Sequence, residues 1–455
     1  MRAWATWMQL SPRQRSCNRF RSAPAPGPVV PPTLFLHALF FTMNRLPVHL
    51  ISVSLVLIGL FGLIGCGGSP SESPEPIRVM TYNIEDIRTD DLRRTDHARM
   101  QRAAAIIQRL QPDILLIQEM TYDEPGAPGY RDGEPEGQNA RRFAENYLAI
   151  PQEESLEGIS FQAFMAPTNT GEASGYDLNR DGNVVTTVPD IPQAPSDTEP
   201  PPQNDEGRAY GEDAWGFGTF PGQYAMALFV RDGLSIQHDQ VRTFRLFTWS
   251  DMPGARRPTD PETGLPWYED DVWAEFRLSS KSHWDVPVTL PNGSVLHVLA
   301  SHPTPPAFDG PENRNKLRNY DEIRFWADYI DGAPYIYDDS TQTGGLPSGA
   351  PFVIMGDQNA DPQGGSSLDG AIEQILNHMR VNDTQPVASE EGIQAFPDLD
   401  PAHTAEWGRR VDYVLPSRAL DVEDSGVWRP LDRDTAGWAS DHFPVWVDLY
   451  PPDAE

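Results

Sequence analysis

Short blocks of apolar residues along the chain predict strands that alternate with helices. Residues 77–82 alternate apolar with polar side chains, which is typical of a strand, and apolar residues recur at helical spacing over about 96–110. Residues 114–117 are all apolar, as in a strand that is buried on both faces, and they lead to Glu119. The succession of strand, helix and strand predicts a layered α/β domain.

The rest of the chain continues this pattern. Acidic or amide residues recur where the predicted strands end, and such positions hold the functional sites of layered α/β proteins. The strand ends are therefore the first place to expect chemistry. Apolar blocks predict further strands over 224–231, 295–301, 352–355, 411–415 and 443–449, and a helix over 316–330.

Two long stretches lack regular patterning. Residues 121–214 are polar and rich in glycine, proline and acidic residues, and residues 251–272 form a shorter stretch that also looks like loop. Connections of this length are uncommon inside compact domains and are mostly functional or inserted segments. We interpret about 121–214 as an insertion into one domain that spans 77–451.

The N-terminal region predicts export. Met43 is followed by a short basic segment and by the apolar run 51–65. At about 15 residues, this run is shorter than the roughly 20 that a membrane-spanning helix needs, although a plain membrane anchor is the alternative. It ends in Leu63-Ile64-Gly65-Cys66, which resembles the lipobox of bacterial lipoproteins, with Cys66 as the lipidated residue. We expect the protein at the cell envelope, on the outer membrane or the cell surface. The predicted divisions are an over-extended gene start (1–42), a signal peptide (43–65) and a tether (66–76).

The charge and the cysteines limit the kinds of partner. Six arginines and no acidic residue lie in 1–65, so the rest of the chain has 29 basic and 66 acidic residues and a formal charge of −37. Such a surface gains little from counterion release, so avid binding of duplex DNA is not expected; a salty habitat is another cause of such a composition. The two cysteines are Cys17 and Cys66, which leaves the predicted mature domain without a disulfide, a thiolate metal site or a catalytic cysteine.

Six short motifs at predicted strand ends carry the candidate chemistry. Each alone is an ordinary turn or cap, but together they follow one another over nearly the whole predicted domain. They are Thr81-Tyr82-Asn83-Ile84-Glu85, Ile117-Gln118-Glu119, Ser301-His302-Pro303, Gly356-Asp357-Gln358-Asn359, Arg410-Val411-Asp412-Tyr413-Val414 and Ser440-Asp441-His442-Phe443-Pro444-Val445. In this order the set resembles the endonuclease/exonuclease/phosphatase superfamily, the DNase I-like group, in an uncharacterised bacterial lipoprotein branch.

The resemblance implies a fold and a set of site residues. The fold class is α/β, and the architecture is a four-layer α/β sandwich in which two packed, mostly antiparallel sheets are flanked by helices. The implied metal ligands are Glu119, as the principal carboxylate, with Asn83, Glu85 and Asp441; relatives often have Asp at the place of Glu85. The implied catalytic residues are His302, Asp357, Asn359, Asp412 and His442.

The same resemblance assigns a role to each catalytic residue. Asp357 would orient or deprotonate the attacking water, and Asn359 would donate a hydrogen bond to a phosphate oxygen. His442, held by Asp412, would contact the phosphate in the transition state. His302 would lie near the leaving group.

The chemistry of these side chains supports the assignment independently. Oxygen ligands without cysteine or paired histidines favour Mg²⁺, Mn²⁺ or Ca²⁺ over zinc. Such a cation polarises a phosphoryl oxygen and stabilises charge on the leaving oxygen, while a carboxylate-held water attacks in line. A histidine paired with an aspartate has its charged form favoured, which suits it to a developing anion.

A second metal signal lies in the predicted insertion. Asp177, Asn179 and Asp181, followed by Gly182, match the first half of an EF-hand calcium loop. The twelfth position is Val188, where a glutamate is expected. A structural Ca²⁺ and a simple acidic turn therefore both stay open.

Aromatic residues are frequent around the second loop-like stretch. They either line a stacking cleft for a nucleobase or a sugar, or pack the loops onto the core. The residues are Trp215, Phe217, Phe220, Tyr224, Trp249, Trp267, Tyr268 and Trp273.

The sequence thus predicts an exported, lipid-anchored, metal-dependent phosphoesterase that hydrolyses phosphate mono- or diesters as a monomer. Its partners would be a small phosphate ester, a nucleotide or a nucleic-acid fragment, and the membrane through the lipid. One alternative is a DNase I-like extracellular nuclease. Another is a non-catalytic surface lipoprotein stabilised by calcium, against which the complete set of implied site residues argues.

Overall fold

The computed structural model describes residues 75–431 and 439–452. The predicted gene start, the signal peptide, Cys66 and the tether up to residue 74 lie outside the described residues. The described part carries two six-stranded sheets.

The first sheet has the strand order β11-β12-β1-β2-β4-β3, and the second has the order β10-β9-β8-β7-β5, with β6 paired to β7. The β1–β2 and β8–β9 pairs are parallel and the other pairs are antiparallel, so both sheets are mixed. The strands of the first sheet are β1 (Ile77–Ile87), β2 (Ile114–Met120), β3 (Phe161–Phe164), β4 (Met226–Arg231), β11 (Val422–Val427) and β12 (Val445–Leu449). Those of the second are β5 (Ser235–Ile236), β6 (Arg242–Thr243), β7 (His283–Thr289), β8 (Val295–Ser301), β9 (Phe352–Asp357) and β10 (Asp412–Pro416).

Neighbouring residues of the central strands enter different apolar layers because successive side chains point to opposite faces of a sheet. In β1, Val79 lies in the core between the two sheets and Met80 lies in the core under the first group of helices. In β9, Met355 lies between the sheets and Ile354 packs with α6. The two sheets therefore stack face to face with helices outside, which confirms the predicted four-layer sandwich.

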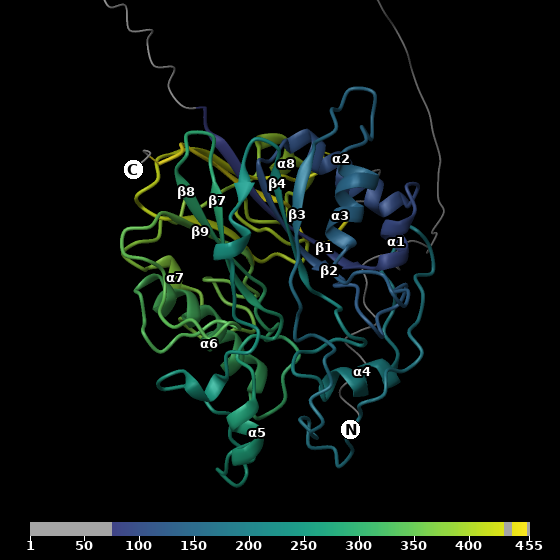
Figure 1. Ribbon diagram of the computed structural model, residues 1–455, viewed down its shortest axis with the longest axis vertical. Helices are drawn as coiled ribbons and strands as arrows, with labels where there is room; N and C mark the ends of the chain where they lie inside the picture. The colour runs from purple at the N-terminus through teal and green to yellow at the C-terminus, as the bar shows by residue number, and fades with distance from the viewer. Residues whose placement is uncertain (1–74, 432–438, 453–455) are drawn as a thin grey trace, which may run out of the picture. The chain divides into compact units, whose positions relative to one another are not determined.

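Helices cover the outer faces of both sheets. Figure 1 shows α1 (Thr89–Arg93), α2 (Ala98–Leu110) and α3 (Asn139–Phe143) on one side of the strands, and α6 (Arg314–Ile330) with α7 (Glu373–Leu376) on the other. Helix α2 ends where Gln111 takes a left-handed conformation just before Pro112, as a chain that cannot continue a helix does. The short helix α8 (Glu390–Ala395) is capped by Ser389, whose hydroxyl accepts a hydrogen bond from Gly392 N.

The stretch 121–214 is only partly an insertion. Residues 139–164 build α3, a π-helical turn (Ala144–Leu148) and the edge strand β3, and Phe143 and Tyr147 are fully buried in the helix-side core. The expectation of an insertion is therefore wrong for this part, because polar residues such as Gln162 hide the short strand's pattern. Helix α4 (Asp205–Glu212), from the later part of this stretch, and α5 (Asp270–Glu275) lie below the sheets in Figure 1.

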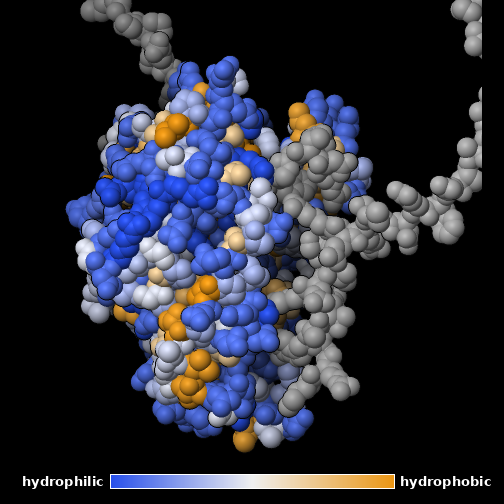
Figure 2. Space-filling view, turned by 90° about the vertical axis from the view of Figure 1, so that its right-hand side faces the viewer, coloured by the Kyte–Doolittle hydropathy of each residue, from blue (hydrophilic) through white to orange (hydrophobic). Residues whose placement is uncertain are grey.

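The described part is mainly polar on the face that Figure 2 shows. Figure 2 shows one face on which hydrophilic side chains dominate and apolar ones form small separate patches. Within the described ranges, no helix is both long and apolar enough to span a bilayer.

Candidate active site

All nine residues that the resemblance implied as metal ligands or catalytic groups meet at one end of the two sheets. Asn83 and Glu119 come from the first sheet, and Asp357 and Asp412 come from the second. His302 follows β8 directly. A chain of contacts joins the whole set, although the role of each residue stays a prediction. The contacts are described below.

Asn83 links the two sheets at the centre of the site. Its amide nitrogen lies 3.2 Å from Glu119 Oε1 and 3.2 Å from Asp357 Oδ2. One neutral donor therefore holds two carboxylates that would otherwise repel each other. The Asn83 side-chain oxygen accepts a hydrogen bond from Glu85 N at 3.0 Å, which fixes the amide in this orientation.

The backbone around Glu119 is held in an unusual conformation. Glu119 has a φ of 65°, and Glu85 and Asp86 have φ values of 50° and 31°, in the left-handed region that side chains rarely adopt. The amide of Asp86 donates to Glu119 Oε2 at 3.1 Å, and the Arg99 guanidinium donates to the carbonyls of this turn, including that of Asp86 at 3.1 Å. Strain of this kind persists where surrounding contacts fix it, often at functional sites.

Asp412 and His442 form a buried pair. His442 Nδ1 lies 2.9 Å from Asp412 Oδ2, and the Thr404 hydroxyl donates to the same oxygen at 2.8 Å. Burial alone would lower the pKa of His442, but the Asp412 carboxylate raises that pKa well above its ordinary value. The imidazole is therefore held in its charged form, with Nε2 3.8 Å from Asp357 Oδ2.

Asp357 faces two histidines of opposite protonation state. Burial, together with the nearby Asp412 charge, raises the pKa of the Asp357 carboxyl to about 7. Its Oδ2 lies 3.5 Å from His302 Nε2, while its Oδ1 accepts a hydrogen bond from Asn359 N at 2.8 Å. Burial lowers the pKa of His302 well below its ordinary value, so this ring is neutral and can donate or accept a proton.

Three carboxylates crowd the opposite side of the site. Burial raises the pKa of Asp441 well above its ordinary value, and the adjacent Glu85 charge raises it further, with a smaller contribution from Glu119. Burial also raises the pKa of Glu119. Asp441 Oδ1 is buried without a hydrogen-bond donor. The same oxygen lies 4.0 Å from His442 Nε2. The mutual repulsion of the carboxylates is what a hard divalent cation would relieve.

A second group of potential metal ligands lies next to these carboxylates. Asp357, Asp412 and His442 place one ligand atom each within 4.8 Å of one another. However, Nδ1 of His442 and the Asp412 carboxylate are already hydrogen-bonded to each other. This geometry suits a charged imidazole at least as well as a metal ligand.

Lys281 belongs to the site although no sequence motif pointed to it. It is 4% exposed, and its ammonium donates to the Pro303 carbonyl at 3.3 Å. Burial lowers its pKa, while the charges of Glu322, Glu119 and Asp357 act in the opposite direction. The sequence has only one other lysine, Lys316, among 35 basic residues, and that rarity is the signal that could have drawn attention to Lys281.

Tyr224 lies near Asp86 and Glu119, on the carboxylate side of the site. It has a φ of 60°, which is an outlier for a bulky residue, and its hydroxyl accepts a hydrogen bond from Gln203 at 2.8 Å. Burial and the charges of Asp86 and Glu119 raise its pKa well above the ordinary value. Sequence patterning placed this residue in a strand, whereas β4 begins two residues later.

The predicted calcium loop forms a hydrogen-bonded turn far along the insertion. Asp177 oxygens accept hydrogen bonds from Asp181 N at 3.0 Å and Gly182 N at 2.8 Å, and the Asn179 amide donates to Glu212 at 2.6 Å. These contacts fit a simple acidic turn as well as an ion site. A structural Ca²⁺ here therefore stays a prediction.

The aromatic residues of the second loop-like stretch mostly pack into the core. Trp215, Phe220, Trp249 and Tyr268 are 6% exposed or less, and the Trp249 ring lies 5.1 Å from that of Trp273. For these residues the structure favours loop packing over a stacking cleft.

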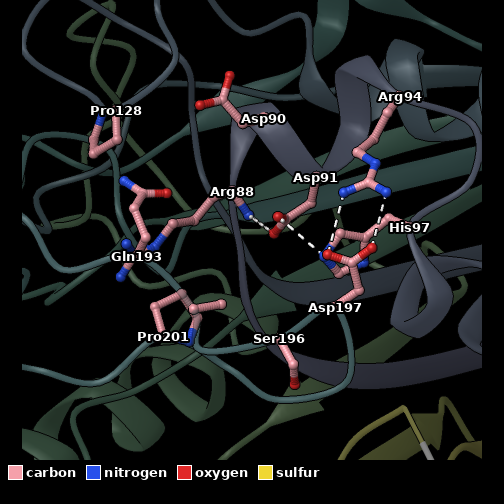
Figure 3. Close-up of a pocket in the computed structure, with 11 residues that line it drawn as sticks. Arg88, Asp90, Asp91, Arg94, His97, Pro128, Gln193, Ser196, Asp197 and Pro201 are labelled. Atoms are coloured by element: carbon pink, nitrogen blue, oxygen red, sulfur yellow. Dashed lines mark hydrogen bonds and ion pairs between the residues drawn. The ribbon is translucent and has the colours of Figure 1, made fainter.

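A cavity of about 190 Å³ lies where the insertion meets α1 and α2 (Figure 3). Arg94 and Asp197 pair across it at 2.8 Å, and His97 Nε2 lies 3.3 Å from Asp91. None of the nine site residues lines it. Arg88 connects the two places, because its guanidinium pairs at 2.9 Å with Asp86, the residue whose amide holds Glu119. The contacts dock the insertion beside the site.

Comparisons with known proteins give a family match and several similar solved structures. A family model described as the Endonuclease/Exonuclease/phosphatase family matches residues 80–442, a span that holds all nine site residues. No curated protein matches the chain.

Several solved structures are similar at low sequence identity. An endonuclease/exonuclease/phosphatase from Beutenbergia cavernae is 18% identical, with 83% of this chain and 72% of that chain covered and a TM-score of 0.45. The human nocturnin catalytic domain is 15% identical, with coverages of 82% and 94% and a TM-score of 0.38. TDP2 from Caenorhabditis elegans is 14% identical, with coverages of 82% and 74% and a TM-score of 0.38.

Proposed function

The chain belongs to the endonuclease/exonuclease/phosphatase family, and from this premise we propose that it is a metal-dependent hydrolase of phosphate mono- or diesters. The observation that carries the proposal is the crowding of Glu85, Glu119 and Asp441 next to the charged His442 side chain. Such a site offers oxygen ligands to a cation on one side and a positive donor to a phosphate on the other.

The described residues fit a hard divalent cation, Mg²⁺ or Mn²⁺/Ca²⁺. Glu119 and Asp441 would hold it, with Glu85 and the Asn83 oxygen nearby, and the unsatisfied Asp441 Oδ1 supports this donor set. When bound, the cation would polarise the phosphoryl oxygen and stabilise charge on the leaving oxygen.

Asp357 and His442 supply the protein's own part of the chemistry. Asp357 is a buried carboxylate with acceptor oxygens beside both histidines, so it can orient an attacking water and take its proton. His442 can donate from Nε2 to a phosphate oxygen, because Asp412 holds the ring at Nδ1. The neutral His302 ring is close enough to Asp357 to pass a proton towards the leaving oxygen.

Lys281 and Asn359 form a second pair of donors for the phosphate. Both donate to the carbonyl of Pro303, at 3.3 Å and 3.1 Å, so their nitrogens lie close together. Each nitrogen carries further hydrogens, which remain for an anionic oxygen. A buried ammonium and a neutral amide that converge in this way suit the negative charge of a phosphate ester.

The proposal is tested by assaying the full chain, purified in detergent, with Mg²⁺, Mn²⁺ or Ca²⁺. The substrates are bis-p-nitrophenyl phosphate, p-nitrophenyl phosphate and plasmid DNA, and the variants are Glu119→Ala and, as an exposed control outside the site, Glu154→Ala. We expect metal-dependent turnover that Glu119→Ala abolishes and Glu154→Ala retains.

The substrate that is hydrolysed fastest shows whether the protein is a diesterase, a phosphatase or a nuclease. The acidic chain favours a small ester over DNA, since few cations are available to neutralise a polyanion. Equal turnover by the wild type and Glu119→Ala would remove the metal assignment. A protein that hydrolyses none of the three substrates would favour the non-catalytic alternative.

We also propose that the protein is exported and anchored through a lipid on Cys66. This segment lies outside the described residues, so the support comes from the sequence alone. The apolar run 51–65 ends in Leu63-Ile64-Gly65 and is followed by Cys66. Metabolic labelling with a radioactive fatty acid should mark the wild type and leave Cys66→Ser unlabelled. Equal labelling of the two would contradict the anchor.

A further inference from the structure

Trp407 is an exposed aromatic residue that packs against the predicted catalytic histidine. The ring centroids of Trp407 and His442 are 4.8 Å apart, and the planes cross at 84°. The residue is 53% exposed, whereas Trp249 and Trp326 are fully buried. A large apolar ring that stays open to solvent next to reacting groups is available to a ligand.

The loop that carries Trp407 is fixed to the site. Thr404 N donates to the Arg409 carbonyl at 2.8 Å, which closes the loop, and Glu406 N donates to the Asp441 carbonyl at 2.8 Å. The indole is therefore presented from a short loop that is tied to the metal side of the site. A ligand that covers it pays little to order this loop.

We propose that Trp407 is a specificity-determining residue that stacks on a nucleobase joined to the phosphate being hydrolysed. The inference rests on the proposed phosphoesterase function and names its substrate class as nucleotide esters. A phosphate that His442 contacts lies next to the indole, so a flat group attached to it through one sugar can reach the exposed ring.

The charge of the protein favours recognition by stacking. The chain has 66 acidic and 35 basic residues, and many arginines near the site are already paired, such as Arg410 with Asp383 at 2.6 Å. Stacking on an aromatic ring holds a base without any positive charge and accepts each base, because every base has a flat face. By contrast, the aromatic residues of the second loop-like stretch are mostly buried and cannot serve.

The test compares two esters that differ only in the base. If the enzyme hydrolyses diesters, they are thymidine 5′-(p-nitrophenyl phosphate) and the same ester of 1,2-dideoxyribose; if it hydrolyses monoesters, they are thymidine 5′-phosphate and 1,2-dideoxyribose 5-phosphate. The full chain is assayed as wild type, Trp407→Leu and Trp407→Phe. Met379→Ala is the control, since Met379 is 82% exposed and precedes Val381, which pairs with Ser417 at the far end of β10.

The ratio of kcat/KM for the ester with the base to that for the ester without it is the readout. We expect the wild type and Met379→Ala to prefer the base, Trp407→Leu to reduce that preference by about 5- to 100-fold, and Trp407→Phe to keep most of it. A role confined to positioning His442 would slow both esters equally and leave the ratio unchanged.

Two results would overturn the inference while the function stands. They are a wild type that hydrolyses both esters equally well, and a Trp407→Leu variant that keeps the wild-type ratio. A wild type that hydrolyses no ester in any metal would instead remove the proposed function, and the substrate inference with it.

Discussion

Asn83 of the first sheet donates a hydrogen bond to Asp357 of the second sheet at 3.2 Å, and the same amide contacts Glu119. The packing of the two sheets therefore brings the proposed metal ligand Glu119 and the proposed water-activating residue Asp357 into contact through one neutral side chain. Replacing that donor by an acceptor of equal shape tests this relationship.

Asn83→Asp should lower both activity and stability. The substitution removes the donor and places a third carboxylate between Glu119 and Asp357, where like charges repel. We expect kcat to fall by about 10²- to 10³-fold and the Tm in EDTA to fall by several degrees. Steady-state kinetics and thermal unfolding measure the two effects. The exposed Asn292→Asp serves as the isosteric control: it loses only the donor to the Pro452 carbonyl, far along the chain from the site residues, and its activity should match the wild type.

Asp412→Asn should reduce turnover while leaving the fold intact. Asp412 accepts hydrogen bonds from His442 and Thr404, and its charge favours the charged imidazole. An asparagine keeps the shape but removes that charge, so His442 should lose its proton more easily and stabilise a developing anion less well. We expect kcat to fall by about 10²-fold or more, with KM changed little. Wild-type kcat in this variant would show that the pair is structural.

Lys281→Met should slow the reaction and also lower the stability of the protein. Methionine keeps most of the length of the side chain but removes the buried charge, which leaves the facing carboxylates of Glu322, Glu119 and Asp357 without that compensation, so the stability should also fall. If the ammonium contacts the phosphate, kcat/KM should fall by about 10²-fold, and Lys281→Arg should not restore it because the planar guanidinium is larger and shaped differently. Lys316→Met, at the other lysine of the chain, is the control. A faster Lys281→Met enzyme would argue against the role.

These residues show what the sequence could and could not predict. Asn83, Glu119 and Asp357 stand in short motifs at the ends of apolar strands, and β8 has the predicted bounds 295–301. Both could be predicted because a strand and the polar residues at its end are consecutive in the sequence. Lys281 stands in a serine-rich segment without a pattern, and only the packing of the sheets brings it near Glu119. The edge strand Phe161–Phe164 escaped prediction for a related reason, since it is short and only half-buried.

Asp441→Asn should have opposite effects on stability in chelator and in metal. Without a cation, Asp441 is pressed against the Glu85 charge, and its pKa is raised well above the ordinary value by burial and by that charge. The neutral asparagine relieves the repulsion, so Tm in EDTA should rise by a few degrees. Added Mg²⁺ or Mn²⁺ should stabilise the wild type more than the variant, because ligand binding to the folded state raises its stability. Differential scanning calorimetry in EDTA and in each metal tests both effects. Equal metal-induced shifts would place the cation elsewhere.

His283 should make the protein less stable in acid. The ring is buried at the start of β7, with Nε2 2.9 Å from the Glu322 carbonyl, and burial lowers its pKa to about 4. In the unfolded chain the ordinary value is about 6.5. As the pH falls from 6.5 towards 4, the His283 ring therefore binds a proton in the unfolded chain but not in the folded one. This difference lowers the free energy of unfolding by about 2 kcal/mol at pH 5. His283→Gln cannot take that proton. Urea unfolding at pH 7.5 and pH 5 should thus show a larger loss for the wild type than for His283→Gln, and equal losses would mean that the ring gains its charge inside the fold.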